Sequence, residues 1–130
     1  MEFKSLKKKD EFKYEKPSAD ILEVFKNPGV IKVSLISSEF TSLCPITGQP
    51  DYAQIGINCI TKDLCIESKS LKLYLNAYRN EKGFAEQICS RIARDVSSVI
   101  KSKVIVRAVF RSRGGIEIRV EVDSDEISNQ

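Results

Sequence analysis

Residues 52–60, YAQIGINCI, decide the fold, because apolar and polar side chains alternate along the whole stretch. One face of the segment is apolar and consists of Ala53, Ile55, Ile57 and Cys59. A period of two is typical of a β-strand that buries one face and leaves the other in water. The sequence therefore predicts a strand over residues 52–60 in an antiparallel sheet.

The residues before this segment predict a partner strand and a loop. Residues 30–36, VIKVSLI, are rich in β-branched side chains and follow an Asn-Pro-Gly turn at 27–29. Residues 38–51, SEFTSLCPITGQPD, contain two prolines, which oppose a central strand. We therefore expect a strand over 30–36 and an ordered loop over 38–51. After the segment, residues 64–67 are expected to be briefly extended.

The period changes to that of helices further along the chain. Residues 71–78 carry apolar side chains at helical spacing, with Ser68 or Ser70 as the expected N-cap, and Gly83 is expected to end this helix. A second helix over 84–100 is predicted from apolar residues at every fourth position, namely Phe84, Ile88, Ile92, Val96 and Ile100.

Two more strands are predicted at 104–110 and 116–122, joined by a glycine hairpin turn over 111–115, RSRGG. The element order β-β-α-α-β-β predicts an α+β fold, with an antiparallel sheet and two helices on one face. We expect one domain over residues 21–130, preceded by a charged arm over residues 1–20.

Composition excludes several classes of protein. The 130-residue chain contains no histidine, which excludes Ser-His-Asp and Cys-His catalysis and zincin-type metal sites. The four cysteines form no Cys-x-x-Cys pair, so we expect no metal. A net charge of +3 does not predict a nucleic-acid surface, and no uncharged apolar stretch is long enough for a membrane span. The charged N-terminus predicts a cytoplasmic protein.

Cys44 is the strongest candidate for a reactive group. It precedes a proline in a polar loop, where core filling is a poor explanation, whereas the other three cysteines occupy apolar positions. A reactive thiolate needs a lowered pKa or a nearby base. Asp51, at the far end of the same loop, is either that partner or a residue that caps a turn.

Two further segments are candidates for ligand binding. In residues 67–72, ESKSLK, Glu67 can accept hydrogen bonds from ligand N–H groups, and Ser68, Lys69 and Lys72 can meet phosphates near the helix start. Arg113, in the glycine turn, suits phosphate binding. Read alone, these segments are equally a solvated helix start and a plain hairpin turn.

Four collinear segments resemble the unimodal QueF family, the NADPH-dependent 7-cyano-7-deazaguanine reductases. The segments are EFTSLCPITGQPDYA at 39–53, ESKSLKLYL at 67–75, the RNxxxFxE stretch at 79–86 and RGGI at 113–116. The resemblance implies the tunnelling fold (T-fold), in which several subunits close their sheets into a barrel. It further implies that rings form by self-association and that active sites lie between neighbouring subunits.

The resemblance also implies an activity and its residues. Cys44 resembles the family nucleophile, which forms a covalent thioimide with the nitrile carbon, and Asp51 resembles the family proton donor. The residues that resemble the substrate-binding set are Ile66, Glu67, Ser68, Ala85 and Glu86. The residues that resemble the NADPH-binding set are Lys69, Lys72, Arg113 and Gly114. Two hydrides would yield 7-aminomethyl-7-deazaguanine, used for queuosine in tRNA.

One departure from the family pattern keeps alternatives open. The family normally has histidine before the glutamate at position 86, and this chain has Ala85. One alternative is therefore a catalytically impaired homologue that binds deazapurines. Another is an amidinotransferase of the archaeosine type, which forms a thioimide with cyano-deazaguanine already in tRNA, although those relatives lack the ESKSLK-type segment.

Overall fold

A computed structural model of the chain describes residues 16–127, and most of the predicted N-terminal arm lies outside this range. The strands are β1 (Val24–Lys26), β2 (Lys32–Leu43), β3 (Pro50–Ile60), β4 (Leu64–Ile66), β5 (Val104–Arg113) and β6 (Ile116–Asp123). The α-helices are α2 (Ser68–Asn76) and α3 (Ala85–Ile100), and short 3₁₀ turns are η1 (Ala19–Ile21), η2 (Ala77–Asn80) and η3 (Ser124–Glu126).

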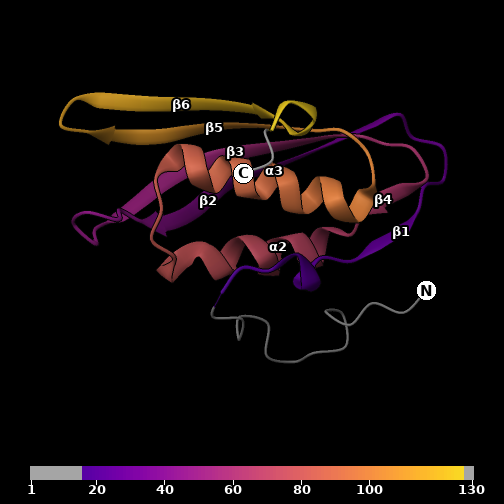
Figure 1. The fold of residues 1–130 in the computed structure, drawn as a ribbon, viewed down its shortest axis with the longest axis horizontal. Coiled ribbons are helices and arrows are strands. Elements are labelled where there is room, and N and C mark those ends of the chain that lie inside the picture. The colour runs from indigo at the N-terminus through magenta and orange to yellow at the C-terminus, as the bar shows by residue number, and fades with distance from the viewer. Residues whose placement is uncertain (1–15, 128–130) are drawn as a thin grey trace.

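The main sheet has the strand order β2-β3-β5-β6, and each neighbouring pair is antiparallel. Its strands follow the chain order, with both helices inserted between β3 and β5 and packed on one face of the sheet (Figure 1). The predicted α+β class and β-β-α-α-β-β order are therefore confirmed.

The core lies between this sheet face and the two helices. One row across the sheet pairs Leu35 with Ile57, Ile57 with Val106 and Val106 with Val122. The helix α3 presents its stripe of every fourth residue to this row, and Ile92 and Val96 are each 0% exposed. Within residues 16–127, no helix has both the length and the apolar character to cross a membrane.

The predicted loop over 38–51 is wrong at both ends. Strand β2 continues to Leu43 and β3 begins at Pro50, so the turn comprises only residues 44–49. A register shift between Ser37 and Phe40 marks a bulge, after which Phe40 points into the core and is 2% exposed. Pro50 is tolerated in the sheet because it is the first residue of β3. Likewise, β5 extends to Arg113, which leaves Gly114 and Gly115, at φ 61° and 81°, as the hairpin turn.

The predicted helix starts need correction. The N-cap of α2 is Glu67 rather than Ser68 or Ser70, because its two carboxylate oxygens accept the N–H groups of Lys69 and Ser70, both at 2.7 Å. Phe84 is the N-cap of α3 and is 50% exposed, so it does not belong to the buried stripe.

The sequence pattern did not predict strand β1. It pairs with β4 in a separate two-stranded antiparallel sheet, with Val24 opposite Ile66. The described part of the predicted arm, residues 16–20, is docked on the body, where Pro17 is buried and its carbonyl accepts a hydrogen bond of 2.7 Å from Arg91.

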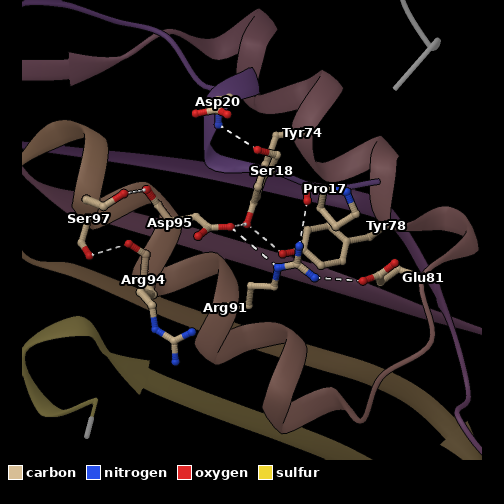
Figure 2. A network of polar contacts seen from close by, with 11 residues as sticks. Pro17, Ser18, Asp20, Tyr74, Tyr78, Glu81, Arg91, Arg94, Asp95 and Ser97 are labelled. Atoms are coloured by element: carbon tan, nitrogen blue, oxygen red, sulfur yellow. Dashed lines mark hydrogen bonds and ion pairs between the residues drawn. The ribbon is translucent and has the colours of Figure 1, made fainter. Parts of the chain in front are cut away.

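A polar network joins α2, η2 and α3 in the interior (Figure 2). The Tyr74 hydroxyl donates to an Asp95 carboxylate oxygen at 2.6 Å and lies 2.8 Å from the Tyr78 hydroxyl. Arg91 lies over the Tyr78 ring and donates to a Glu81 carboxylate oxygen at 2.9 Å. Burial is the main cause that raises the pKa of both tyrosines, so they stay neutral donors.

We expect Tyr74→Phe to lower the free energy of unfolding by about 1–3 kcal/mol, because the substitution removes one hydroxyl and leaves the buried groups around it without a partner. Urea unfolding at fixed protein concentration measures this change. The matched control is Tyr52→Phe, since Tyr52 is 46% exposed, and its effect is expected within about 0.5 kcal/mol. Equal effects of the two substitutions would contradict this account.

Candidate active site

Cys44 lies at the start of the turn between β2 and β3, at one end of the sheet (Figure 1). Two backbone hydrogen bonds close the turn: the Cys44 N–H donates to the Gln49 carbonyl at 2.8 Å, and the Gly48 N–H donates to the Cys44 carbonyl at 2.9 Å. Pro45 limits the backbone freedom of the turn. The thiol is therefore held on a short, rigid turn and is partly accessible to solvent.

The environment of the Cys44 thiol lowers its pKa from 9.0 to about 7. The largest cause is the Thr47 side chain, followed by backbone hydrogen bonds from Thr47 and Ile46, and Arg113 makes a smaller contribution in the same direction. Burial instead raises the pKa of Cys59 to about 11 and that of Cys89 to about 12. Cys44 is thus the cysteine with a demonstrable thiolate tendency near neutral pH.

The other cysteines fill the core, as predicted from their positions. Cys59 and Cys89 are each 0% exposed, and Cys65 is 3% exposed. All four thiols are free.

We expect Thr47→Val to raise the pKa of Cys44 part of the way back toward 9.0, because valine keeps the shape of threonine and removes the hydroxyl. At pH 7 the thiolate fraction of Cys44 falls. The rate at which iodoacetamide alkylates Cys44 should therefore fall by up to about threefold. Peptide mass spectrometry over a pH series measures the rate and the apparent pKa. Thr47→Ser restores a hydroxyl and should restore the pKa; an unchanged profile in Thr47→Val would contradict this role.

Asp51 and Arg113 meet beside the turn. Ser42 and Asp51 are directly paired across β2 and β3, so the two strands carry Cys44 and Asp51 on either side of one tight turn. An Arg113 guanidinium nitrogen donates to an Asp51 carboxylate oxygen at 2.7 Å. Arg113 thus contacts Asp51 directly, and the pairing of Asp51 with Cys44 stays a prediction.

The start of α3 lies at the same end of the molecule. The Leu43 N–H donates to the Glu81 carbonyl at 2.9 Å, and the Gly83 N–H donates to the Leu43 carbonyl at 3.1 Å. These bonds attach the segment just before α3 to the residue just before Cys44. Ala85 and Glu86, the first two residues of α3, are thereby brought toward the turn.

The second half of the predicted site lies elsewhere. Ile66, Glu67 and Ser68 form the junction of β4 and α2, at the opposite end of the molecule from the turn (Figure 1). Glu67 is 9% exposed and Ile66 is 4% exposed. The single chain brings Cys44, Asp51 and Arg113 together and does not bring the Glu67 junction to them.

A groove connects the two ends. It has a volume of about 1020 Å³ and runs between residues 33–41 of β2 and the side chains of Ser68, Lys72 and Arg79. Leu43 and Pro50, which flank the turn, line its other end. Lys69 is at the second position of α2, and Gly114 is in the β5–β6 hairpin turn. In the described part of the chain, no group of three or more Cys, Asp and Glu residues could hold a metal ion.

The sequence interpretation missed the role of Thr47. The signal was available, since a hydroxyl residue three positions after a cysteine in a proline turn can reach back to the thiol. The contact of Arg113 with Gln49 was not foreseeable, because it depends on how the two hairpins lie in space.

Comparisons with known proteins agree with one another. The family described as QueF-like protein matches residues 50–129. The chain is 46% identical over 123 residues to the NADPH-dependent 7-cyano-7-deazaguanine reductase of Helicobacter pylori (strain G27), covering 92% of this chain and 82% of that protein. It is 46% identical over 112 residues to the reductase of the same name from Helicobacter acinonychis (strain Sheeba), covering 83% of this chain and 74% of that protein.

A solved structure shares the fold. The crystal structure of the archaeosine synthase QueF-Like in the apo form superposes with a TM-score of 0.70 and 19% sequence identity. The match covers 77% of this chain and 99% of that chain. At this identity the likeness shows the T-fold alone.

Proposed function

Because the chain belongs to the QueF-like protein family, we propose that it is an oxidoreductase that uses NADPH to reduce the nitrile of 7-cyano-7-deazaguanine to an aminomethyl group. The product, 7-aminomethyl-7-deazaguanine, serves queuosine biosynthesis. The curated relatives carry the name of this reductase, and the residues at the β2–β3 turn fit its chemistry.

The single observation that carries the proposal is the Cys44 thiol, whose pKa is about 7. A nitrile carbon is a weak electrophile, so its attack needs a strong, soft nucleophile and an acid for the nitrogen. With no histidine in the sequence, no imidazole can deprotonate the thiol. The donors of the turn itself, headed by Thr47, stabilise the thiolate instead.

The first step then follows from Cys44 and Asp51. The Cys44 sulfur forms a bond to the nitrile carbon, and one π-electron pair of the C≡N bond moves to nitrogen. The Asp51 carboxylate, ion-paired with Arg113, takes up the proton that leaves the Cys44 thiol and passes it to that nitrogen, which gives a neutral thioimide on Cys44 and returns Asp51 to its carboxylate form. Two NADPH molecules, bound one after the other, would each supply one of the two hydrides that complete the reduction.

The carboxylates of Glu67 and Glu86 suit the purine-like edge of the substrate. Two neighbouring N–H donors of such a ring match the two oxygens of one carboxylate. Glu86 is exposed at the second position of α3, and Glu67 lies at the β4–α2 junction, where each of its oxygens already accepts one backbone N–H. A carboxylate oxygen has a second acceptor position, so this capping role is compatible with a ligand.

The residues present fit a phosphate-bearing cosubstrate. Lys72 and Arg79 are exposed cations that line the groove, whose volume of about 1020 Å³ is large enough for a dinucleotide portion. Lys69 lies one turn before Lys72 on α2. These residues would hold the phosphates, and β2 would form the opposite wall.

We propose that the complete site forms between subunits. In the described residues, β2 and β6 are the edges of the main sheet, which leaves strand edges for pairing with a neighbour. Ile36 and Ile116 are each 68% exposed near these edges. Self-association into a ring would cover them and would bring the Glu67 junction of one subunit to the Cys44 turn of the next. The cytoplasmic location remains a prediction.

The test uses the purified protein and 7-cyano-7-deazaguanine. Without NADPH, intact-mass analysis should show one added substrate mass, located by peptide mapping on Cys44. With NADPH, the absorbance of the reduced nicotinamide should fall and the aminomethyl product should appear. No adduct and no NADPH oxidation by the assembled protein would contradict the proposed function.

The alternatives give different results in the same test. A homologue impaired by Ala85 would form the adduct and then fail to oxidise NADPH. An amidinotransferase would require cyano-deazaguanine within tRNA and ammonium, and would need no NADPH. The fold likeness at 19% identity does not favour it, because the relatives at 46% identity are named reductases.

A further inference from the structure

Arg113 reaches from the β5–β6 hairpin to the turn that carries Cys44. One terminal nitrogen donates to Asp51 at 2.7 Å, and the other contacts the side-chain oxygens of Gln49 and, at 3.4 Å, Thr47. These three partners are more than sixty positions away in the sequence. The contacts therefore depend on the tertiary structure. They attach the Cys44 turn and Asp51 to the β5–β6 hairpin.

The local backbone aims Arg113 at this position. The β5–β6 register shifts between Phe110 and Arg113, which indicates a bulge, and Arg113 then pairs with Ile116 across the two glycines. A bulge redirects the side chains that follow it. The side chain of Arg113 is 40% exposed and that of Asp51 is 20% exposed, so the ion pair lies at the surface beside the turn.

We propose that Arg113 is a positioning residue, which holds the Asp51 carboxylate and the Cys44 turn in a fixed relation so that the acid and the nucleophile act on the same nitrile. This inference rests on the proposed function. The planar guanidinium contacts carboxylate and turn with different nitrogens, a geometry that a lysine ammonium does not reproduce. A misplacement of about 1 Å at a reacting group can cost about 10²-fold in rate.

Within residues 16–127, Arg113 is the cation that contacts both Cys44 and Asp51. Asp51 faces the turn from β3, and Glu81 and Lys82 lie beside Leu43 through the segment before α3. Contacts with Asp51 and then with Cys44 raise the pKa of Arg113, so the guanidinium stays charged. Because Arg113 is the last of the causes that lower the pKa of Cys44, its main expected effect is on geometry.

The test compares Arg113→Gln and Arg113→Lys with Arg119→Gln. Arg119 lies on the same hairpin and also pairs with a carboxylate, that of Glu117 at 2.8 Å, and its side chain is 75% exposed. The rate of adduct formation on Cys44 is measured without NADPH, so that contacts to the cosubstrate do not affect it. We expect Arg113→Gln to slow the adduct about tenfold or more, Arg113→Lys to recover little of this loss, and Arg119→Gln to stay within about twofold.

A double-mutant cycle with Asp51→Asn distinguishes positioning from a general structural role. If Arg113 acts through Asp51, the effect of Arg113→Gln should shrink to about twofold in the Asp51→Asn background. Urea unfolding midpoints of all variants check folding, and Arg113→Lys keeps the charge if Arg113→Gln is unstable.

Three results would overturn the proposal. Normal adduct rates in Arg113→Gln, with only a raised KM for NADPH, would make Arg113 a phosphate contact. Multiplicative effects in the cycle would show that Arg113 and Asp51 act independently. If the wild-type protein forms no adduct, the proposed function fails, and hydrogen exchange of the turn over residues 44–49 then decides: exchange that stays as in the wild type in Arg113→Gln would overturn the positioning role, and faster exchange in Arg113→Gln but not in Arg119→Gln would support it.

Discussion

Cys44→Ala is expected to abolish both the covalent adduct and the oxidation of NADPH in the presence of 7-cyano-7-deazaguanine. In the proposed reaction the nitrile is reduced only after its carbon becomes part of a thioimide, and alanine provides no atom for that bond. Of the thiols, that of Cys44 has its pKa lowered to about 7 and is partly exposed, so no other cysteine offers an equivalent nucleophile. Intact-mass analysis and nicotinamide absorbance measure the two losses on one sample.

The matched control is Cys59→Ala. Cys59 is 0% exposed in the core and burial raises its pKa to about 11, so its removal leaves the turn intact. We expect Cys59→Ala to lower the free energy of unfolding by about 1 kcal/mol, as is usual for a small truncation in the core. Adduct formation should be retained. Adduct formation by Cys44→Ala, or its loss in Cys59→Ala with normal folding, would show that the nucleophile is assigned to the wrong residue.

The sheet and helices were predictable because their side-chain periods are regular over many residues. Residues 52–60 alternate throughout, and the structure buries Ile55 and Ile57 almost completely. The length of β2 was not predictable, because its second half is specified by a bulge and by pairing with β3 rather than by its own pattern. The same holds for β1, a three-residue strand that exists through its partner β4.

The candidate site was predictable only in part, for a related reason. The position of Cys44 before a proline and its separation from Asp51 along the sequence are local features of one short segment. The sequence indicated both. The contacts of Arg113 join residues on two hairpins, and no local sequence pattern predicts such a contact. The separation of the Glu67 junction from the turn is likewise a property of the fold, and it is what makes a site shared between two subunits chemically reasonable.

Asp51→Asn is expected to slow adduct formation by about 10²–10⁴-fold, the usual effect of removing a general acid. Asparagine keeps the size of the side chain and can still accept a hydrogen bond from Arg113, but it has no acidic proton for the nitrile nitrogen. Asp51 is not among the causes that lower the pKa of Cys44, so alkylation of the thiol by iodoacetamide should change little. Parallel measurement of both rates over the same pH series provides the comparison.

This pairing of rates separates the two chemical tasks of the turn. Thr47→Val should slow alkylation and adduct formation by the same factor, because it acts on the thiolate alone. Asp51→Asn should slow the adduct and spare alkylation, because it acts on the proton that the nitrile receives. If Asp51→Asn slowed both reactions equally, Asp51 would be a residue that supports the thiolate. The proton would then have to come from another donor, for which Glu86, exposed in the first turn of α3, is the next residue to test.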